Sequence, residues 1–132
     1  MAKAGYYYDV EVMDPHSDWG MVRHTDSRDR REGEAYIKIP SGIAYDFGIY
    51  NSAGAGGDIF GKSLFNCTTA DGSFSVVLRA EGNQSYKEFA KQFAGDGDLK
   101  AVGELYRVIG AHAGDTIRVK WTSESDIVVE KL

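Results

Sequence analysis

Leu64-Phe-Asn-Cys-Thr-Thr-Ala-Asp-Gly-Ser-Phe-Ser-Val-Val-Leu-Arg-Ala80 is the stretch that decides the fold class. Two runs of alternating residues flank the pair Asp71-Gly72, and such alternation is typical of strands with one buried face. Asp-Gly between two such runs is a strong signal for a β-hairpin. We therefore predict strands over Leu64–Ala70 and Ser73–Ala80, joined by a turn.

Strand patterns also occur on both sides of this hairpin. Tyr6–Met13 alternates, and so does Glu34–Ile39, where the apolar residues share one face and Tyr36 and Lys38 lie on the opposite, exposed face. Pro40 then removes a backbone donor and ends the strand. Two further alternating runs predict a closing hairpin over Asp115–Thr122 and Ile127–Leu132.

Short helices are predicted in two places. The first follows an N-cap at Ser41 and ends at Gly48, which supplies a left-handed C-terminal residue. The second covers Leu99–Ile109, where apolar residues recur every three or four positions, and Asp98 is its expected cap. Tyr86–Phe93 fits either a helix or an extended arm.

These elements indicate a mainly β fold with short helices (α+β). No regular β-α-β repeat is present, so a parallel sheet is not expected. A seven-stranded open β-pseudobarrel with two or three short helices fits best. We expect a single domain over residues 1–132, with residues 1–5 flexible.

Composition limits the function classes. The chain has 132 residues, a net charge of -5 and one cysteine, Cys67, so an internal disulfide framework is excluded. No apolar run approaches the roughly 20 residues that a membrane span requires, and we expect a cytoplasmic protein with no membrane partner. The acidic balance disfavours a non-specific nucleic-acid coat, because such proteins need a broad basic surface. Any contact with nucleic acid must be local.

Enzymatic motifs are weak. Gly56–Ser63 has the spacing of a phosphate-binding loop, but the strand that should precede it and the helix that should follow are missing. Cys67 alternates with Phe65 and is expected to be buried rather than nucleophilic. Three histidines lack metal-ligand spacing, and a nuclease centre has only one loose candidate set, Asp14, Glu34 and Lys38. We therefore predict a non-enzymatic domain without a cofactor or a metal.

Two polar segments carry side chains suited to DNA. Arg, Asn and Gln can form paired hydrogen bonds with base edges, whereas Lys, Ser and Tyr commonly hold phosphates. Acidic residues dilute both segments, so solvated loops neutralised by their own ion pairs remain an alternative. The candidate residues are Arg23, Arg28, Arg30 and Arg31 in the first segment and Arg79, Asn83, Gln84, Tyr86, Lys87 and Lys91 in the second.

Ala35-Tyr-Ile-Lys-Ile-Pro-Ser-Gly-Ile43 resembles a region of the N-terminal effector domain of EcoRII-type restriction endonucleases, where a strand runs into Ile-Pro-Ser-Gly-Ile and a short helix. Gly114-Asp-Thr-Ile-Arg-Val119 is similar to the closing strand that this domain shares with plant B-three transcription-factor domains. The resemblance implies a seven-stranded pseudobarrel that grips duplex DNA between two arms in the major groove. The arms would fall in Asp14–Gly33 and Arg79–Lys91, which contain the candidate residues named above.

The sequence thus predicts a double-stranded DNA recognition domain of a restriction or regulatory system, such as bacterial restriction-modification, with a nuclease domain or another protein as a further partner. The same Ile-Pro and Gly-Asp pieces also resemble bacterial AbrB-type swapped-hairpin regulators, which are shorter and dimeric. The alternative from another class is a protein-binding or small-ligand-binding barrel, with Tyr6-Tyr7-Tyr8 and the Gly-rich Asn51–Gly61 as its contact surface.

Overall fold

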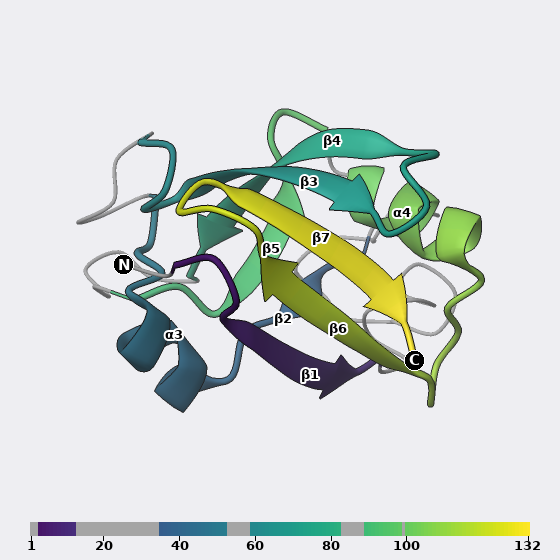
Figure 1. The fold of residues 1–132 in the computed structure, drawn as a ribbon, viewed down its shortest axis with the longest axis horizontal. Helices are drawn as coiled ribbons and strands as arrows, with labels where there is room; N and C mark the ends of the chain where they lie inside the picture. Colours follow the sequence, from purple (N-terminus) through teal and green to yellow (C-terminus); the bar gives the residue numbers. More distant parts are fainter. Residues whose placement is uncertain (1–2, 13–34, 53–58, 83–88, 99) are drawn as a thin grey trace, which may run out of the picture.

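The computed structural model describes residues 3–12, 35–52, 59–82, 89–98 and 100–132. Within them, a seven-stranded mixed sheet curves into a nearly closed barrel, and one short helix lies towards each end of it (Figure 1). The fold is therefore the mainly β pseudobarrel with short helices that the sequence predicts. In chain order the elements are β1 (Tyr7–Glu11), β2 (Ile37–Lys38), α3 (Ser41–Phe47), β3 (Leu64–Thr69), β4 (Ser75–Glu81), β5 (Gln92–Gly95), α4 (Ala101–Ile109), β6 (Thr116–Trp121) and β7 (Asp126–Lys131).

The strand order around the sheet is β1-β6-β7-β3-β4-β5-β2. Both predicted hairpins are confirmed, because β3 pairs with β4 and β6 pairs with β7 in antiparallel register. The two hairpins are joined by a parallel pair, β3 with β7, in which Cys67 lies opposite Ile127. A parallel pair needs a long crossover between its strands, so local sequence patterns did not predict it.

The turn of the first hairpin is organised by Asp71. Its Oδ1 accepts hydrogen bonds from the backbone N–H and the hydroxyl of Ser73 and from the hydroxyl of Thr69. These bonds, led by the backbone N–H of Ser73, hold the pKa of the Asp71 carboxyl below its usual range. Gly72 has a φ of 78°, which explains why glycine follows the aspartate.

Aromatic rings fill the centre of the barrel. Trp121 is fully buried, and its ring centroid lies 5.3 Å from that of Phe47, 6.0 Å from that of Phe65 and 6.2 Å from that of Tyr8. These rings come from β6, α3, β3 and β1, so the same cluster joins α3 to the strands. Buried aliphatic residues from the inner faces of the strands complete the core.

The seam between the edge strands β1 and β2 is bridged by side chains. Tyr8 on β1 donates its hydroxyl to the backbone oxygen of Lys38 at 3.0 Å, and Tyr106 on α4 donates to the backbone oxygen of Tyr36 at 2.8 Å. Burial raises the pKa of both phenols, so both hydroxyls keep their protons at neutral pH. Two tyrosines thus occupy carbonyl groups that a neighbouring strand would otherwise bind.

The helix ends agree in part with expectation. Gly48 and Gly110 are the left-handed C-caps of α3 and α4. The prediction that Ser41 caps α3 is wrong, because Pro40 occupies the cap position and Ser41 is the first helical residue. Pro40 suits this junction, since its fixed φ leads from the strand into the helix.

The entry to α4 also differs from expectation. Lys100 rather than Asp98 is the cap residue, although Asp98 Oδ1 accepts the Lys100 backbone N–H at 3.0 Å. The chain passes close to β5 here. A Cβ atom at Gly95 would lie 2.1 Å from the backbone oxygen of Asp98, so only glycine fits at this point of β5.

Two further expectations are corrected. Tyr36 is only 7% exposed, so it does not share the exposed face with Lys38. β2 covers only Ile37–Lys38, and the chain around it departs from regular alternation.

In the ambiguous stretch Tyr86–Phe93, residues 86–88 lie outside the described part of the chain. The remainder is extended, because Phe89 forms a β-bridge with Tyr50 and Gln92 begins β5.

The seam bonds give a first prediction. Tyr8→Phe removes only a hydroxyl and leaves the Lys38 carbonyl without that donor, so we expect the free energy of unfolding to fall by about 1 to 2 kcal/mol. Urea denaturation followed by tryptophan fluorescence measures the change. Tyr7→Phe is the matched control, since Tyr7 is 50% exposed on the same strand. An unchanged midpoint for Tyr8→Phe would show that the seam does not depend on this bond.

Candidate nucleic-acid interface

The outer surface of β4, β5 and β2 brings together polar side chains from distant parts of the sequence. Glu81 lies opposite Gln92, and Gln92 lies opposite Lys38, so these residues form one row across the three strands. Arg79 lies one row further along β4, opposite Ala94. Because paired residues share a face of a sheet, the row points outwards together. Lys91 precedes Gln92 by one position and does not belong to this row, but its side chain is exposed at the Ile39 end of it. We call this surface, with Lys91 at its end, the β4–β5–β2 wall: Lys38, Arg79, Glu81, Lys91, Gln92 and Asp96.

The described residues that follow residues 13–34 and 83–88 lie at opposite ends of the β2–β5 pair. Ile39 donates its backbone N–H to Lys91, and Lys91 donates its own to Glu81, so the end of β4 and the start of β5 lie beside the end of β2. Phe89, which follows residues 83–88, is therefore close to the Ile39 end. Because β2 and β5 are antiparallel, Ala35, which follows residues 13–34, lies towards the other end of the pair.

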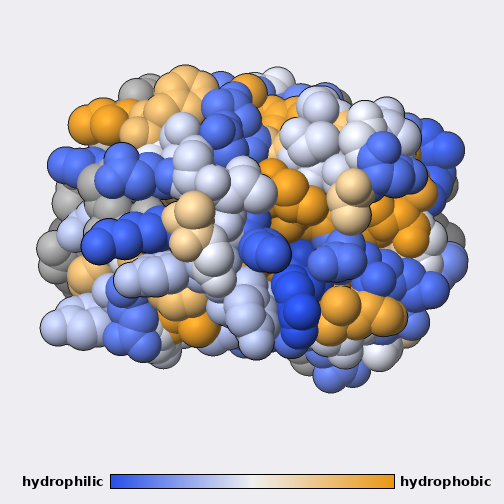
Figure 2. All heavy atoms as spheres, in the orientation of Figure 1, coloured by the Kyte–Doolittle hydropathy of each residue, from blue (hydrophilic) through white to orange (hydrophobic). Residues whose placement is uncertain are grey.

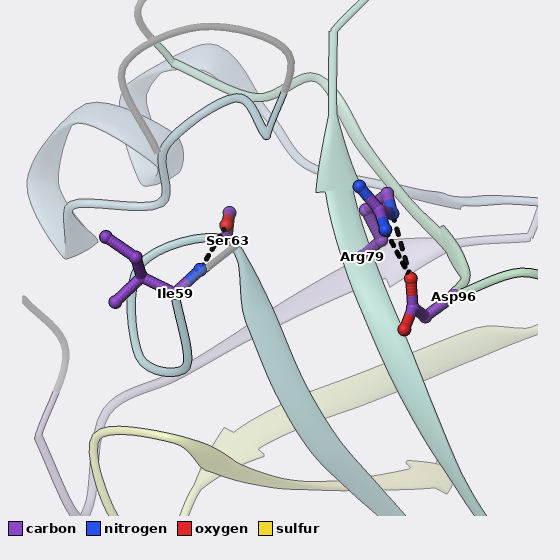
Figure 3. Close-up of polar contacts among 4 residues, drawn as sticks. All are labelled: Ile59, Ser63, Arg79 and Asp96. Carbon is purple, nitrogen blue, oxygen red and sulfur yellow. Dashed lines mark hydrogen bonds and ion pairs between the residues drawn. The ribbon is translucent and has the colours of Figure 1, made fainter. Parts of the chain in front are cut away.

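Arg79 is held by Asp96. The Nε atom of Arg79 lies 3.0 Å from Oδ1 of Asp96, a second guanidinium nitrogen contacts the same oxygen, and the two side chains are 32% and 33% exposed (Figure 3). At this exposure water screens the pair, so its contribution to stability is small. Its effect is to orient the guanidinium and to offset part of its charge.

The other charges of the wall are less balanced. Gln92 donates from Nε2 to Oε2 of Glu81 at 3.1 Å. Lys38 and Lys91 are exposed and form no ion pair with any residue that the structure describes. Three cations thus face two carboxylates on a chain whose total charge is -5. The wall is a local exception to the acidic balance.

On the surface of β1 and β6, opposite charges pair with each other. Arg118 on β6 binds both carboxylate oxygens of Asp9 at 2.8 and 3.1 Å and covers the ring of Tyr7 at 4.3 Å. This bonding holds the pKa of Asp9 below its usual range. Figure 2 shows that hydrophilic and hydrophobic residues are interspersed over β6 and β7.

The candidate residues fall into two groups. Arg79 and Lys91 are described, and both belong to the wall. Lys91 contributes in two ways, since its backbone joins β4 to the Ile39 end of β2 while its side chain is exposed. The remaining candidates lie outside the described residues: Arg23, Arg28, Arg30, Arg31, Asn83, Gln84, Tyr86 and Lys87.

Lys38 and Gln92 are members of the wall that sequence analysis did not select. The alternation of Ile37, Lys38 and Ile39 did place Lys38 on the outside, and the structure confirms its exposure. What local patterns could not supply is the pairing of β2 with β5, which places Lys38 beside Gln92.

Other motifs have structural roles. Ser63, the last residue of the apparent phosphate loop, is buried, and its hydroxyl accepts the Ile59 N–H at 3.3 Å (Figure 3). β3 begins at Leu64, so a strand follows this stretch, as predicted, and not the helix that phosphate binding requires. Among the described residues, no three His, Cys, Asp or Glu side chains cluster as metal ligands would.

The tyrosines proposed as an alternative contact surface are partly committed to packing. The rings of Tyr6 and Tyr8 lie 5.0 and 6.4 Å from that of Phe47, and Tyr8 closes the seam. Tyr7 lies under Arg118. In the second part of that surface, residues 53–58 lie outside the described part of the chain. None of the described helices has both the length and the apolar character needed to cross a membrane.

Comparisons with known proteins identify a similar fold but no related family. No protein-family model and no curated protein matches this sequence. Among solved structures, a hypothetical protein of Arabidopsis thaliana is similar, with a TM-score of 0.56 and 10% sequence identity over 100% of this chain and 94% of that chain. At that identity the similarity shows a shared fold and carries no function with it.

Cys67 provides a second prediction. Burial raises the pKa of its thiol to about 12, so almost no thiolate is present at pH 8. We expect the native protein to react with a thiol-specific reagent at the rate of global unfolding, and the urea-unfolded protein to react at once. With an aromatic disulfide as the reagent, the absorbance of the aromatic thiolate that it releases follows both reactions. Fast labelling of the native protein would contradict the buried position of Cys67.

Proposed function

We propose that this domain recognises specific sequences in double-stranded DNA as the non-catalytic part of a restriction or regulatory system. The observation that carries the proposal is the position of the β4–β5–β2 wall between Phe89, which follows residues 83–88, and Ala35, which follows residues 13–34. Because the wall has an excess of positive charge, it suits a phosphate backbone lying between those segments.

The chemistry of the segments supports the same proposal. Residues 13–34 contain Arg23, Arg28, Arg30 and Arg31, and residues 83–88 contain Asn83, Gln84, Tyr86 and Lys87. Arginine, asparagine and glutamine match the donor and acceptor patterns of guanine and adenine in the major groove. Tyr86 and Lys87, with Lys38 and Lys91 of the wall, would contact phosphates and set the register on the duplex.

The overall charge defines what kind of binding to expect. With a net charge of -5, the chain gains little from long-range attraction to DNA. Affinity for random duplexes should therefore be weak, and most of the binding free energy should come from contacts with a preferred sequence. The resemblance to the EcoRII N-terminal and plant B-three domains points in the same direction, since both use a seven-stranded pseudobarrel for duplex recognition.

Selection from a randomised duplex pool tests the proposal. The purified domain is mixed with the pool at low salt, the bound fraction is sequenced, and binding of an enriched duplex is measured by fluorescence anisotropy over a range of salt concentrations. We expect a short enriched motif and an affinity that falls steeply with salt. Absence of retention at the lowest salt would overturn the proposal and favour a protein or a small ligand as the partner.

The wall is tested with Lys38→Gln. We expect a several-fold loss of affinity for all duplexes and a smaller salt slope, because one phosphate contact is removed. Lys131→Gln is the matched control, since Lys131 is an exposed lysine on β7, which is separated from β2 by at least two strands in either direction around the barrel. Equal losses for the two variants would indicate an effect of net charge and not of the wall.

Asn83 and Gln84 test base recognition. Asn83→Ala or Gln84→Ala should relax the preference at one base position by about 1 to 3 kcal/mol, whereas Lys87→Ala should weaken binding to all sequences alike. Competition between the selected duplex and single-position variants measures the preference. A uniform loss on every sequence for all three variants would contradict direct base recognition.

A further inference from the structure

Three aromatic rings gather on the surface beside the Ile39 end of the wall. Tyr45 on α3 contacts Phe89 with ring centroids 5.4 Å apart, and Phe89 stacks on Tyr50 with centroids 5.3 Å apart and planes 23° apart. We call Tyr45, Tyr50 and Phe89 the aromatic platform. Tyr45 is 70% exposed, and its one described ring contact, with Phe89, is an edge contact with the two planes 64° apart.

The backbone beneath the platform is held on three sides. Ala90 donates its N–H to Ile49 at 3.0 Å, Tyr50 donates to Lys62 at 2.9 Å, and Ser52 donates to Ala80 at 3.0 Å. The residues after α3 are thereby attached to β4, to the start of β5 and to the chain before β3. The backbone that carries Tyr50 and Phe89 therefore has little conformational entropy left to lose when a ligand contacts the platform.

The exposed ring of Tyr45 differs from the other tyrosine rings at the surface. Tyr7 is covered by the guanidinium of Arg118, and Tyr6 packs against Phe47 in the core cluster. Tyr45 has its described ring contact on one side alone, with Phe89. An aromatic surface left in water on a rigid support is a common property of ligand-binding sites.

Positive charge lies next to the platform. Lys91 follows Phe89 by two residues, and Lys62 lies beside Tyr50, to which it is hydrogen-bonded through the backbone. Neither lysine forms an ion pair with any residue in the described ranges. Aromatic rings with lysines at the neighbouring backbone positions suit a ligand that combines a planar base with a negatively charged backbone.

We propose that the aromatic platform stacks against an unpaired nucleobase of DNA while Lys62 and Lys91 contact the phosphates of the same strand. The inference rests on the proposed function, because it takes DNA as the ligand. It adds a second feature of the DNA ligand, a base outside the double helix. It assigns recognition of that base to Tyr45 and its neighbours and not to Asn83 and Gln84, which are proposed to contact paired bases. Stacking of this kind does not depend on which base is present, since every base has a π-face.

Fluorescence anisotropy with three probes tests the inference: a perfect duplex, the same duplex with one unpaired adenine, and the single strand alone. We expect the duplex with the unpaired base to bind at least about 5-fold more tightly than the perfect duplex. Tyr45→Ala should remove this preference, and Tyr45→Phe should retain it, because stacking needs the ring and not the hydroxyl. Tyr7→Ala is the control for loss of another exposed tyrosine ring.

A second readout detects stacking directly. With 2-aminopurine in place of the unpaired adenine, stacking on Tyr45 should lower the probe fluorescence on binding, and Tyr45→Ala should abolish that decrease. Because Tyr45 is on the surface, the variant should keep the unfolding midpoint of the parent protein, and urea denaturation checks this.

The outcomes separate this inference from the proposed function. Equal affinity for the perfect and interrupted duplexes, unchanged by Tyr45→Ala, would overturn the platform and leave duplex recognition intact. Tyr45-dependent binding of the unpaired base together with no binding of the perfect duplex would support the platform and overturn duplex recognition. No binding of any of the three probes would overturn both.

Discussion

Closure of the barrel around the Trp121 core is the constraint on which the rest of the structure depends, and at the seam it is completed by the hydrogen bond from the Tyr8 hydroxyl to the Lys38 carbonyl. A seven-stranded sheet that curls without closing leaves two edges with unsatisfied backbone groups. Tyr8 reaches across from one edge strand to the other, and Tyr106 on α4 donates to the carbonyl of Tyr36, just before β2. A strand of two residues has little ladder of its own, so these side chains hold β2 in place. Lys38 is exposed beside β5, where it pairs with Gln92.

This construction gives the two sides of the barrel different surfaces. Around β1 and β6, the charges neutralise each other in contacts such as that of Arg118 with Asp9. Around β2 and β5, Lys38 and Lys91 keep their charges available, and the only carboxylate bound to a cation there, within the described residues, is Asp96 with Arg79. An acidic protein can therefore present a basic surface locally, because electrostatic interactions at a surface act over about 10 Å and not over the whole molecule.

Elements with a local cause could be predicted. The Asp71-Gly72 hairpin, the closing hairpin, the glycine caps at Gly48 and Gly110 and the burial of Cys67 all follow from patterns within about ten residues. The errors occurred where tertiary packing overrides such patterns. Tyr36 is buried although strand alternation predicts exposure, because it lies just before β2 and beside α4, whose Tyr106 binds its carbonyl. Ser41 has the right chemistry for a cap, but Pro40 occupies the cap position and the helix begins at Ser41 itself.

The sequence by itself determined the fold class, both hairpins, the two helices and the two polar segments, since each depends on the order of residues along a short stretch of chain. Only the tertiary structure decided that β3 pairs with β7 in parallel, that β2 lies beside β5, and that Tyr45, Tyr50 and Phe89 meet at one point of the surface. These contacts join residues separated by tens of positions. The free energy that stabilises these contacts comes from closing the whole barrel around the Trp121 core. Patterns within a short stretch of sequence therefore cannot predict them.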